Sequence, residues 1–313
     1  MSAEQVADFR TMIKNRPGGM KSIISGIAGV DELGNNINVE LDDETPHMMI
    51  FGKTGAGKTI TIMTILYSVM SAVDPTQLKI AYIDGKGNSF ELMRTDNKNS
   101  ESYRPNPFTY SRPADASTDI DYVRAKLKHI KKETKRRKEL LKQRGVSKIS
   151  EFNKRYPDEA LYEILLVVDE FSAITDQDND LKSNELAEYG AVDSIEYLAK
   201  EAGDVGIHLL LANQTAKKEK VPDKISANIG GRLSLGVTEP IENDLALPES
   251  GISVHLINQP GEFYSTMNGV RNPEHGNSPY LPDEVIYELN DSLEEQFGHH
   301  DYVVTKEQIM EKM

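Results

Sequence analysis

Cysteine and long apolar runs are both missing from this sequence of 313 residues. Without cysteine, disulfide bonds and thiolate metal sites are excluded, and a reducing compartment is permitted. The longest apolar runs, such as Ile164–Val168 and Ile207–Ala212, are far shorter than the roughly 20 residues that span a bilayer. The N-terminus MSAEQVADFR is polar, so no signal peptide is predicted. We expect a soluble, cytoplasmic chain, which can still be a fragment of a membrane-tethered protein.

An excess of basic residues is also missing. The chain has 36 Lys and Arg against 50 Asp and Glu, which gives a net charge of −14. This balance excludes a general affinity of the whole surface for nucleic acid, so any contact with DNA has to be local. The length allows one large core with a small accessory element.

A phosphate-binding loop is present as GKTGAGKT, Gly52–Thr59, directly after the apolar stretch Met48–Phe51. It fits the pattern GxxxxGK[ST] at every fixed position, between a strand and the apolar helix Ile60–Met70. A chance glycine-rich turn is the alternative, and this strand and helix argue against it. Lys58 is predicted to reach the β- and γ-phosphates of ATP, and Thr59 to bind Mg²⁺. The residues predicted to bind the nucleotide are Gly52, Lys53, Thr54, Gly55, Ala56, Gly57, Lys58, Thr59 and Ile60.

Two further strand ends complete a predicted hydrolytic site. The run ILLVVDEF, Ile164–Phe171, places Asp169 where it can bind Mg²⁺ with Thr59, and Glu170 where it can deprotonate the attacking water. An isolated Asp-Glu pair is common in turns, but here it follows an intact phosphate loop. Gln214, after a third strand, can touch the γ-phosphate and the water. Lys58, Glu170 and Gln214 are the predicted catalytic residues.

The apolar pattern predicts an α/β fold. Four short runs separated by helical patterns indicate a mainly parallel sheet covered on both faces. These runs are Met48–Phe51, Ile80–Ile83, Ile164–Val168 and Ile207–Ala212. His208, inside the last run, is interpreted as a core histidine, and the seven histidines show no metal-binding spacing.

Three segments are expected along the chain. Residues 1–45 form a lead-in with a helix and short strands, including a hairpin turn at Asp31–Asn36 and a strand at Ile37–Leu41. Residues 46–290 form the ATPase core, and residues 291–313 a C-terminal helix and polar tail. Further elements expected in the second half are the strands Leu233–Val237 and Glu262–Ser265 and the helix Asp283–Phe297.

About half of Arg124–Lys148 is lysine and arginine, with apolar residues at helical spacing. One interpretation is a helix that binds nucleic acid. The other, which we favour, is an amphipathic helix whose basic face meets solvent or an acidic neighbouring subunit.

Several motifs in order resemble the motor domain of the FtsK/SpoIIIE family. They are PHMMIFGKTGAGKT (46–59), AYIDGKGNSFEL (81–92), KRRKELLKQRGVSKISEFN (135–153), ILLVVDEF (164–171), GIHLLLANQT (206–215) and KISANIGGRLSL (224–235). The resemblance implies a RecA-like P-loop NTPase core, a homo-oligomeric ring of six with ATP between subunits, and loops that pull a polymer through the central hole.

The sequence departs from that family at two places. Family members that pump DNA carry an arginine just before GIHL, which reaches the neighbour's ATP, whereas this chain has Gly203 and Asp204 there. The candidates for a substitute arginine finger or sensor are Lys200 and Arg232, unless another subunit or domain supplies the group. The isolated chain is therefore expected to hydrolyse ATP slowly. The second departure is Val237–Leu247, where the family has a Ser-Arg pair after an aspartate.

Three functions remain open. The first is an ATP-driven translocase of double-stranded DNA, in chromosome segregation or conjugative transfer. The second is an ATPase of a type VII-like protein secretion system, favoured by the acidic loop Thr175–Asp180 and the overall charge. The third is a nucleotide-binding assembly module with weak hydrolysis, against which Glu170 argues. We place DNA first, and a membrane anchor or partner outside this sequence is compatible with it. The lysines predicted to contact DNA, unless their loop is a solvated turn, are Lys217, Lys218, Lys220 and Lys224.

Overall fold

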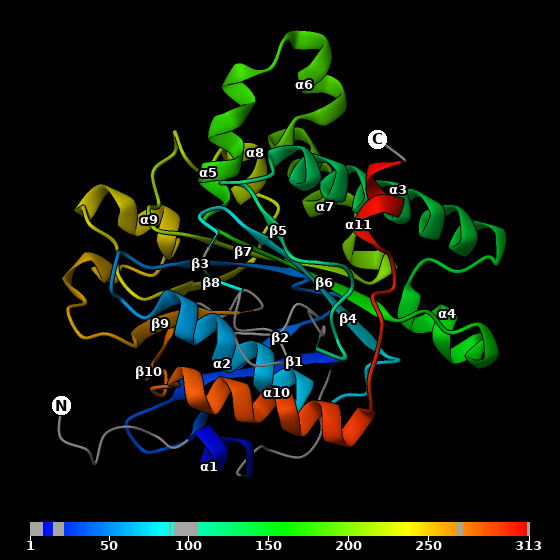
Figure 1. Ribbon diagram of the computed structural model, residues 1–313. Coiled ribbons are helices and arrows are strands. Elements are labelled where there is room, and N and C mark those ends of the chain that lie inside the picture. The colour runs from blue at the N-terminus through cyan, green and yellow to red at the C-terminus, as the bar shows by residue number, and fades with distance from the viewer. Residues whose placement is uncertain (1–8, 15–21, 88, 91–105, 268–271, 312–313) are drawn as a thin grey trace.

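Ten strands form one sheet in the computed structural model, which describes residues 9–14, 22–87, 89–90, 106–267 and 272–311 (Figure 1). The strands are β1 (Ile24–Val30), β2 (Asn36–Leu41), β3 (His47–Phe51), β4 (Leu78–Asp84), β5 (Ala114–Asp115), β6 (Glu163–Asp169), β7 (Ile207–Asn213), β8 (Gly231–Ser234), β9 (Glu262–Thr266) and β10 (Glu274–Asn277). Their order across the sheet is β2-β1-β10-β9-β8-β3-β7-β6-β4-β5.

Six neighbouring strands, from β8 to β5, run parallel. Strands β3, β4 and β7 are buried along their whole length, which explains why they read as continuous apolar runs. All four predicted core strands are found here, each extended by one to three residues. The predicted α/β fold with a mainly parallel core is confirmed.

The other end of the sheet is antiparallel. β1 and β2 form the predicted hairpin, in whose turn the Asp31 carboxylate accepts hydrogen bonds from the backbone N–H groups of Leu33 (2.9 Å) and Asn35 (2.8 Å). β1 then joins β10 through the single pair Val30–Asn277. The lead-in therefore continues the sheet of the core, and the boundaries at residues 45 and 290 stay predictions.

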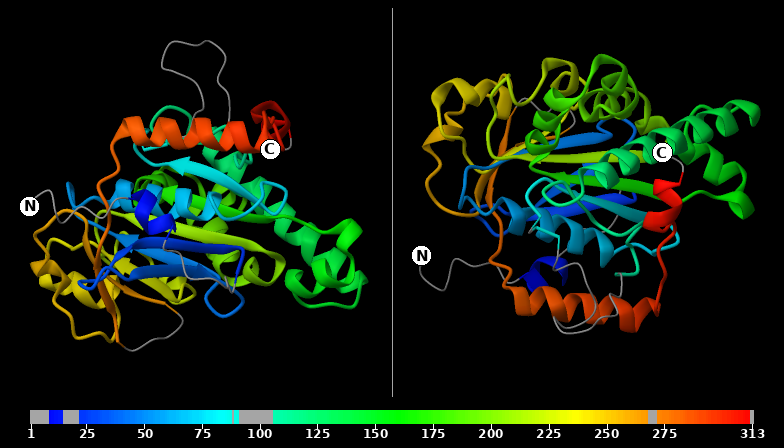
Figure 2. Two further views of the ribbon diagram at one scale, coloured as in Figure 1. Left: turned by 90° about the horizontal axis from the view of Figure 1, so that it is seen from below. Right: turned by 45° about the horizontal axis from the view of Figure 1, so that its top comes forward.

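Helices cover both faces of the sheet (Figures 1 and 2). They are α1 (Phe9–Lys14), α2 (Lys58–Met70), α3 (Ile120–Gln143), α4 (Ile149–Arg155), α5 (Phe171–Asp176), α6 (Ser183–Tyr189), α7 (Ala191–Glu201), α8 (Asp223–Ser226), α9 (Asn243–Ala246), α10 (Asp283–Phe297) and α11 (Lys306–Met310). One apolar core lies between the sheet and α2, α10 and α1, and a second lies under α3, α5 and α7.

β1 also packs directly on α2, the helix that follows the phosphate loop. The backbone N–H of Ile27 donates to Ser68 Oγ over 2.7 Å. A Cβ added to Gly26 would lie 2.9 Å from Ile65 Cγ2, so only glycine lets the strand approach this closely. The lead-in and the phosphate-loop helix therefore form one packed unit.

Some expectations need adjustment. The predicted strand Leu233–Val237 is instead Gly231–Ser234, because Gly236 has a left-handed backbone (φ 101°) that ends the extended run. The polar tail contains α11, which packs on α3 with Ile309 buried. The short strands β5 and β10 were not predicted. The expected N-terminal helix is seen as α1, while residues 1–8, 15–21 and 312–313 lie outside the described part.

The basic segment Arg124–Lys148 is helical as expected, but only in part. It falls mainly in α3, which begins at Ile120 behind the N-cap carboxylate of Asp119. The helix ends before Gly145, whose φ of 65° suits the left-handed end of a helix. A second helix, α4, then contains the last residues of the family-like segment 135–153.

Candidate nucleotide site

The phosphate loop connects the carboxyl end of β3 to the first residue of α2, Lys58. Gly55 and Gly57 have left-handed backbones (φ 79° and 94°), which a residue with a Cβ rarely adopts. A Cβ on Gly57 would also lie 3.1 Å from the backbone nitrogen of Gly261. Lys53 N–H donates to the Gly236 carbonyl (2.9 Å), and this holds the loop against the segment after β8. Gly55 and Gly57 of GKTGAGKT are therefore required by the backbone path.

Lys58 and Asp169 are brought together as predicted. The Lys58 ammonium forms a buried ion pair with Asp169, which lies at the end of β6. Ser89 Oγ donates to the other carboxylate oxygen over 2.6 Å, and the Glu170 N–H donates to Oδ1 over 2.9 Å. Thr59 follows Lys58 in the first turn of α2 and is half-buried. The Thr59 hydroxyl, in the phosphate loop, and the Asp169 carboxylate, beside it, are thus two candidate oxygen ligands for a metal ion.

Glu170 is held in an unusual backbone conformation. Its φ of 52° and ψ of 53° are left-handed, a strain that clusters at functional sites in non-glycine residues. Ser172 Oγ donates to Glu170 Oε1 over 3.2 Å. Oε2 is buried and accepts no hydrogen bond from any described residue. Lys86 Nζ lies 3.5 Å from it.

Gln214 lies directly after β7, the strand between β3 and β6. Its Oε1 accepts a hydrogen bond from Thr54 Oγ1 of the phosphate loop (3.3 Å). The ends of β3, β6 and β7 therefore gather the three predicted parts of the site at one edge of the sheet. This is the edge at which open α/β sheets bind ligands.

These groups fit ATP with Mg²⁺. The loop and the start of α2 supply backbone N–H donors for phosphates, and Lys58 supplies a cation. The described residues contain no group of three acidic or histidine side chains that would hold a metal alone. Mg²⁺ needs none, because it is usually bound by one or two protein oxygens together with substrate phosphates and water. Thr59 and Asp169 would provide those protein oxygens.

The turn after β4 has no predicted role, but it supports both Asp169 and Glu170. Asp84 accepts hydrogen bonds from the N–H groups of Lys86 (2.9 Å) and Gly87 (2.8 Å). A Cβ on Gly85 would lie 2.3 Å from the Glu170 carbonyl oxygen, so glycine is required there. The sequence does contain a signal for this turn, because Asp84 is an acidic residue at the end of β4, the strand next to β6. The last two residues of the motif AYIDGKGNSFEL (81–92), Glu91 and Leu92, lie outside the described residues.

Of the two candidate substitutes for the missing arginine, Arg232 is unsuited to the role. Its side chain is buried and donates to the carbonyls of Ser226 (2.8 Å) and Gly231 (3.0 Å), and burial lowers the pKa of its guanidinium to about 10. A group held in this way inside its own chain does not reach a neighbouring subunit. Lys200 is half-exposed on α7 and pairs with Glu196 (2.5 Å).

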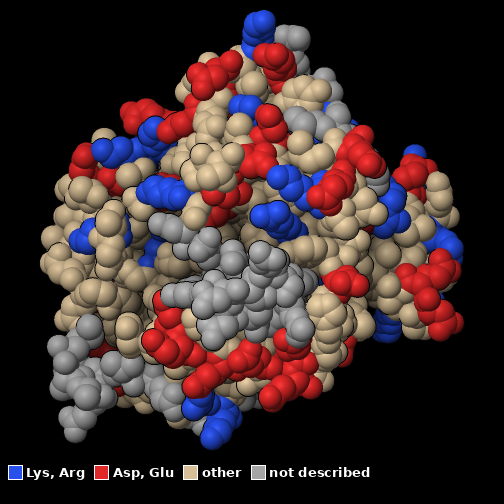
Figure 3. Space-filling model, viewed as in Figure 1, with Lys and Arg blue, Asp and Glu red and all other residues tan. Residues whose placement is uncertain are grey.

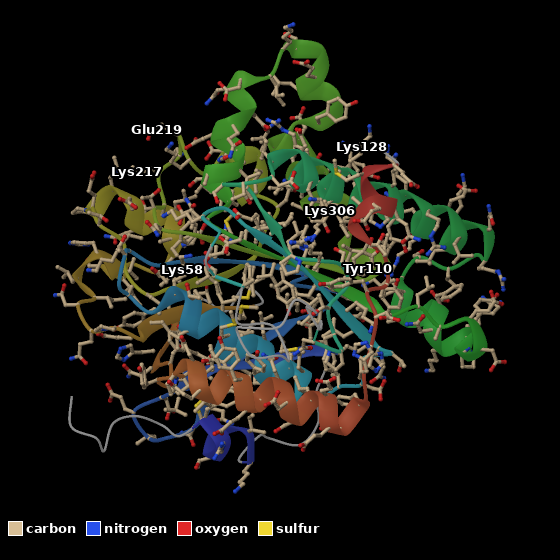
Figure 4. The ribbon with its side chains drawn as sticks, in the orientation of Figure 1. Lys58, Tyr110, Lys128, Lys217, Glu219 and Lys306 are labelled. Atoms are coloured by element: carbon tan, nitrogen blue, oxygen red, sulfur yellow. The ribbon has the colours of Figure 1, made fainter. Side chains whose placement is uncertain are left out.

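The four lysines of the predicted DNA loop all form ion pairs within the chain. Figure 4 shows Lys217 and Glu219 on this loop after β7. The pairs are Lys217–Glu239 (2.8 Å), Lys218–Asp223 (3.6 Å), Lys220–Asp176 (2.5 Å), and Lys224 with Asp193 (2.8 Å) and Glu196 (2.9 Å). Exposed pairs of this kind contribute little to stability, so phosphates can displace the carboxylates at small cost.

On α3 the basic side chains are similarly engaged. Arg137 pairs with Glu133 (2.8 Å), Lys138 with Glu201, and Lys131 and Lys135 lie over the ring of Tyr197. In Figure 3 blue and red side chains are interspersed over the described part of this face. These contacts favour the interpretation of α3 as an amphipathic helix of the fold.

His208 is buried as expected, with Nδ1 2.9 Å from the Pro46 carbonyl oxygen.

Comparison with known proteins agrees with this site. The model of the FtsK/SpoIIIE family matches residues 20–256. The chain belongs to this family. DNA translocase SftA of Bacillus subtilis (strain 168) is 29% identical over 287 residues, and a DNA translocase FtsK of Caldanaerobacter subterraneus subsp. tengcongensis is 27% identical over 272. The matches cover 90% and 87% of this chain but only 28% and 35% of those relatives.

Solved structures show the same fold at low sequence identity. The cytoplasmic domain of the type VII secretion ATPase EccC of Thermomonospora curvata superposes with a TM-score of 0.72 at 17% identity, over 96% of this chain and 33% of that one. The pCW3 conjugation coupling protein TcpA, with ATPγS, gives 0.71 at 18% identity, over 95% and 75%. Among the described residues, none of the helices has the length and apolar character needed to cross a membrane.

Proposed function

We propose that this chain is the motor domain of an ATP-driven translocase of double-stranded DNA. The observation that carries the proposal is the convergence of Lys58, Asp169, Glu170 and Gln214 at the ends of three adjacent strands. Family membership supports ATP hydrolysis, and the two curated relatives named above are DNA translocases.

Each side chain has a distinct role in this proposal. Lys58 would leave Asp169 for the β- and γ-phosphates, and Asp169 would then hold Mg²⁺ together with Thr59. Bound Mg²⁺ neutralises charge on the phosphates. Glu170, with a buried oxygen that accepts no hydrogen bond from a described residue, is suited to take a proton from water. Gln214 contacts the phosphate loop through Thr54 and would orient the same water.

A ring of six copies, with ATP between neighbours, is part of the proposal. Gly203 and Asp204 stand where relatives carry the arginine that reaches the neighbour, and Arg232 is buried. Lys200 or a partner outside this sequence would then supply a cation, and weak turnover is expected from the chain alone. A membrane-anchored region or partner outside this sequence is compatible with such a motor, which would act in the cytoplasm.

The second candidate is an ATPase of protein secretion. Two observations favour it: the net charge of −14, and the pairing of all four loop lysines with carboxylates. The acidic segment Thr175–Asp180 is not a loop as expected, because it forms the end of α5 and a 3-10 turn. It also gives less support than expected, since Asp178 is buried and accepts hydrogen bonds from the N–H groups of Ala191 and Val192 (both 3.0 Å). One carboxylate of that segment therefore holds the start of α7.

The test measures ATP turnover and binding with and without double-stranded DNA at several salt concentrations. DNA should raise turnover several-fold, and the logarithm of the binding constant should fall linearly with that of salt concentration. A variant with Lys217, Lys218, Lys220 and Lys224 changed to Ala should lose most of the salt slope. Glu170→Gln should lower turnover by about 10²–10⁴, leaving a measurable residual rate, and should keep ATP binding. If DNA neither binds at low salt nor raises turnover, secretion becomes the better proposal.

A further inference from the structure

Lys86 lies on the turn after β4, in the segment DGKG. The backbone N–H groups of Lys86 and Gly87 both donate to the Asp84 carboxylate, so the turn is fixed from inside. The turn is also fixed against β6, because Gly85 N–H donates to the Asp169 carbonyl over 2.8 Å. The backbone that carries Lys86 therefore has a defined position relative to Glu170.

The Lys86 side chain points at the Glu170 oxygen that accepts no hydrogen bond from the described residues. Nζ lies 3.5 Å from Oε2, and the lysine side chain is 45% exposed while that of Glu170 is 9% exposed. The other oxygen, Oε1, is occupied by Ser172 Oγ. A buried polar oxygen without a partner is unfavourable, and a cation within about 4 Å offsets that cost.

We propose that Lys86 is a positioning residue for Glu170. Its ammonium fixes which way Oε2 faces, while Ser172 fixes Oε1. This inference rests on the proposed function, since it assumes that Glu170 is the base in ATP hydrolysis. Lys86 is half-exposed and lies on the turn after β4, outside the phosphate loop. Its charge can therefore act on Glu170 although Lys86 is not part of that loop.

Lys86→Met keeps the length of the side chain and removes the charge. We expect kcat for ATP to fall about tenfold or more, because positioned acid–base groups contribute about 10²–10⁴ in rate. The KM and the ATP dissociation constant should change less than about twofold. Lys86→Arg should restore most of kcat. Lys154→Met, which changes an exposed lysine of α4, is the matched control and should leave kcat unchanged.

A double variant separates positioning from a general effect on the fold. In a Glu170→Gln background, Lys86→Met should lower the residual rate no further, since residues that act as a unit lose activity non-additively. Lys86→Gln provides a second neutral variant if Lys86→Met folds poorly by circular dichroism. Equal losses in both backgrounds would overturn the proposal.

The outcomes also separate this inference from the proposed function. If the wild-type chain turns over ATP, Glu170→Gln lowers turnover as predicted, and Lys86→Met keeps full kcat, only the role of Lys86 is wrong. A rise in kcat for Lys86→Met would equally contradict it, because Lys86 would then restrain the base. If Glu170→Gln retains the wild-type rate, the assignment of Glu170 fails and the proposed hydrolytic site with it.

Discussion

Gly203 packs against the ring of Pro46 so closely that a Cβ added to the glycine would lie 2.7 Å from the proline Cβ. Gly203 begins the short 3-10 turn η4 (Gly203–Val205) that leads into β7, and Pro46 directly precedes β3. This glycine stands where relatives are expected to carry an arginine. The departure from the family pattern is therefore also a feature of packing.

Gly203→Ala should lower the free energy of unfolding by about 1–3 kcal/mol, because the proline ring has little freedom to move aside. Denaturant unfolding followed by circular dichroism would measure the loss. Asp204→Ala, at the exposed neighbouring position, should change stability by less than about 0.5 kcal/mol. An alanine variant as stable as the wild type would show that Pro46 gives way.

Asp204→Arg is the better way to restore the missing cation, because Asp204 is exposed and one residue away. If a trans-acting arginine is what limits hydrolysis, this variant should raise kcat at least about tenfold, since such groups contribute about 10³–10⁵ elsewhere. Turnover should be measured against protein concentration, as the effect requires contact between copies. Asp204→Ala is the control for removal of the negative charge. An equal gain in Asp204→Ala would argue against a finger.

Lys58→Met should remove ATP binding and also destabilise the fold. The buried Asp169 carboxylate would lose its charged partner and keep only Ser89 and one backbone N–H, at a cost of about 1–3 kcal/mol. ATP with Mg²⁺ should raise the melting temperature of the wild type but not of this variant. Asp169→Asn in the Lys58→Met background should recover part of the stability. Unchanged ATP affinity in Lys58→Met would contradict the site.

His47 should make stability depend on pH. Burial, with a smaller effect from His208, lowers the pKa of the His47 imidazole to about 3, well below its usual value of 6.5. Between these values the unfolded chain binds more protons than the folded one. The contribution of neutral His47 is therefore complete above pH 6.5 and decreases as the pH falls, by up to about 1.4 kcal/mol per unit. Denaturation at pH 7, 6 and 5 measures how the free energy of unfolding depends on pH. This dependence should be weaker than in the wild type for His47→Asn but unchanged for the exposed His299→Asn.

The sequence predicts most of the core because its signals are local. A continuous apolar run marks a buried parallel strand, and the phosphate loop has fixed glycines, so Gly52–Thr59, Asp169 and Gln214 meet as expected. Strands β5 and β10 escape because they have two and four residues, too few for a periodic pattern. The burial of Arg232 is not predictable for another reason. Its partners are backbone carbonyl groups, and a sequence pattern does not show which carbonyls are free to accept a hydrogen bond.

Lys86 shows a different limit of sequence analysis. Its motif is visible, but its contact with Glu170 depends on β4 and β6 being neighbours in the sheet. The paired state of the loop lysines is likewise a tertiary property. Except for Asp223, which lies in the loop, their partners come from three other segments of the chain. The charge of the lysines alone therefore suggests a free cationic surface that the structure does not have.

The hairpin of β1 and β2 carries a mechanical consequence. A pull on residues 24–41 has two routes to the phosphate loop: through the sheet by way of β10, β9 and β8 to β3, or through α2, on which β1 packs. The first route crosses from β1 to β10 at the pair Val30–Asn277, beside which Ser278 Oγ donates to the Ala28 carbonyl over 2.7 Å. Tension applied at this hairpin would also act on the helix that begins with Lys58, with no flexible linker between.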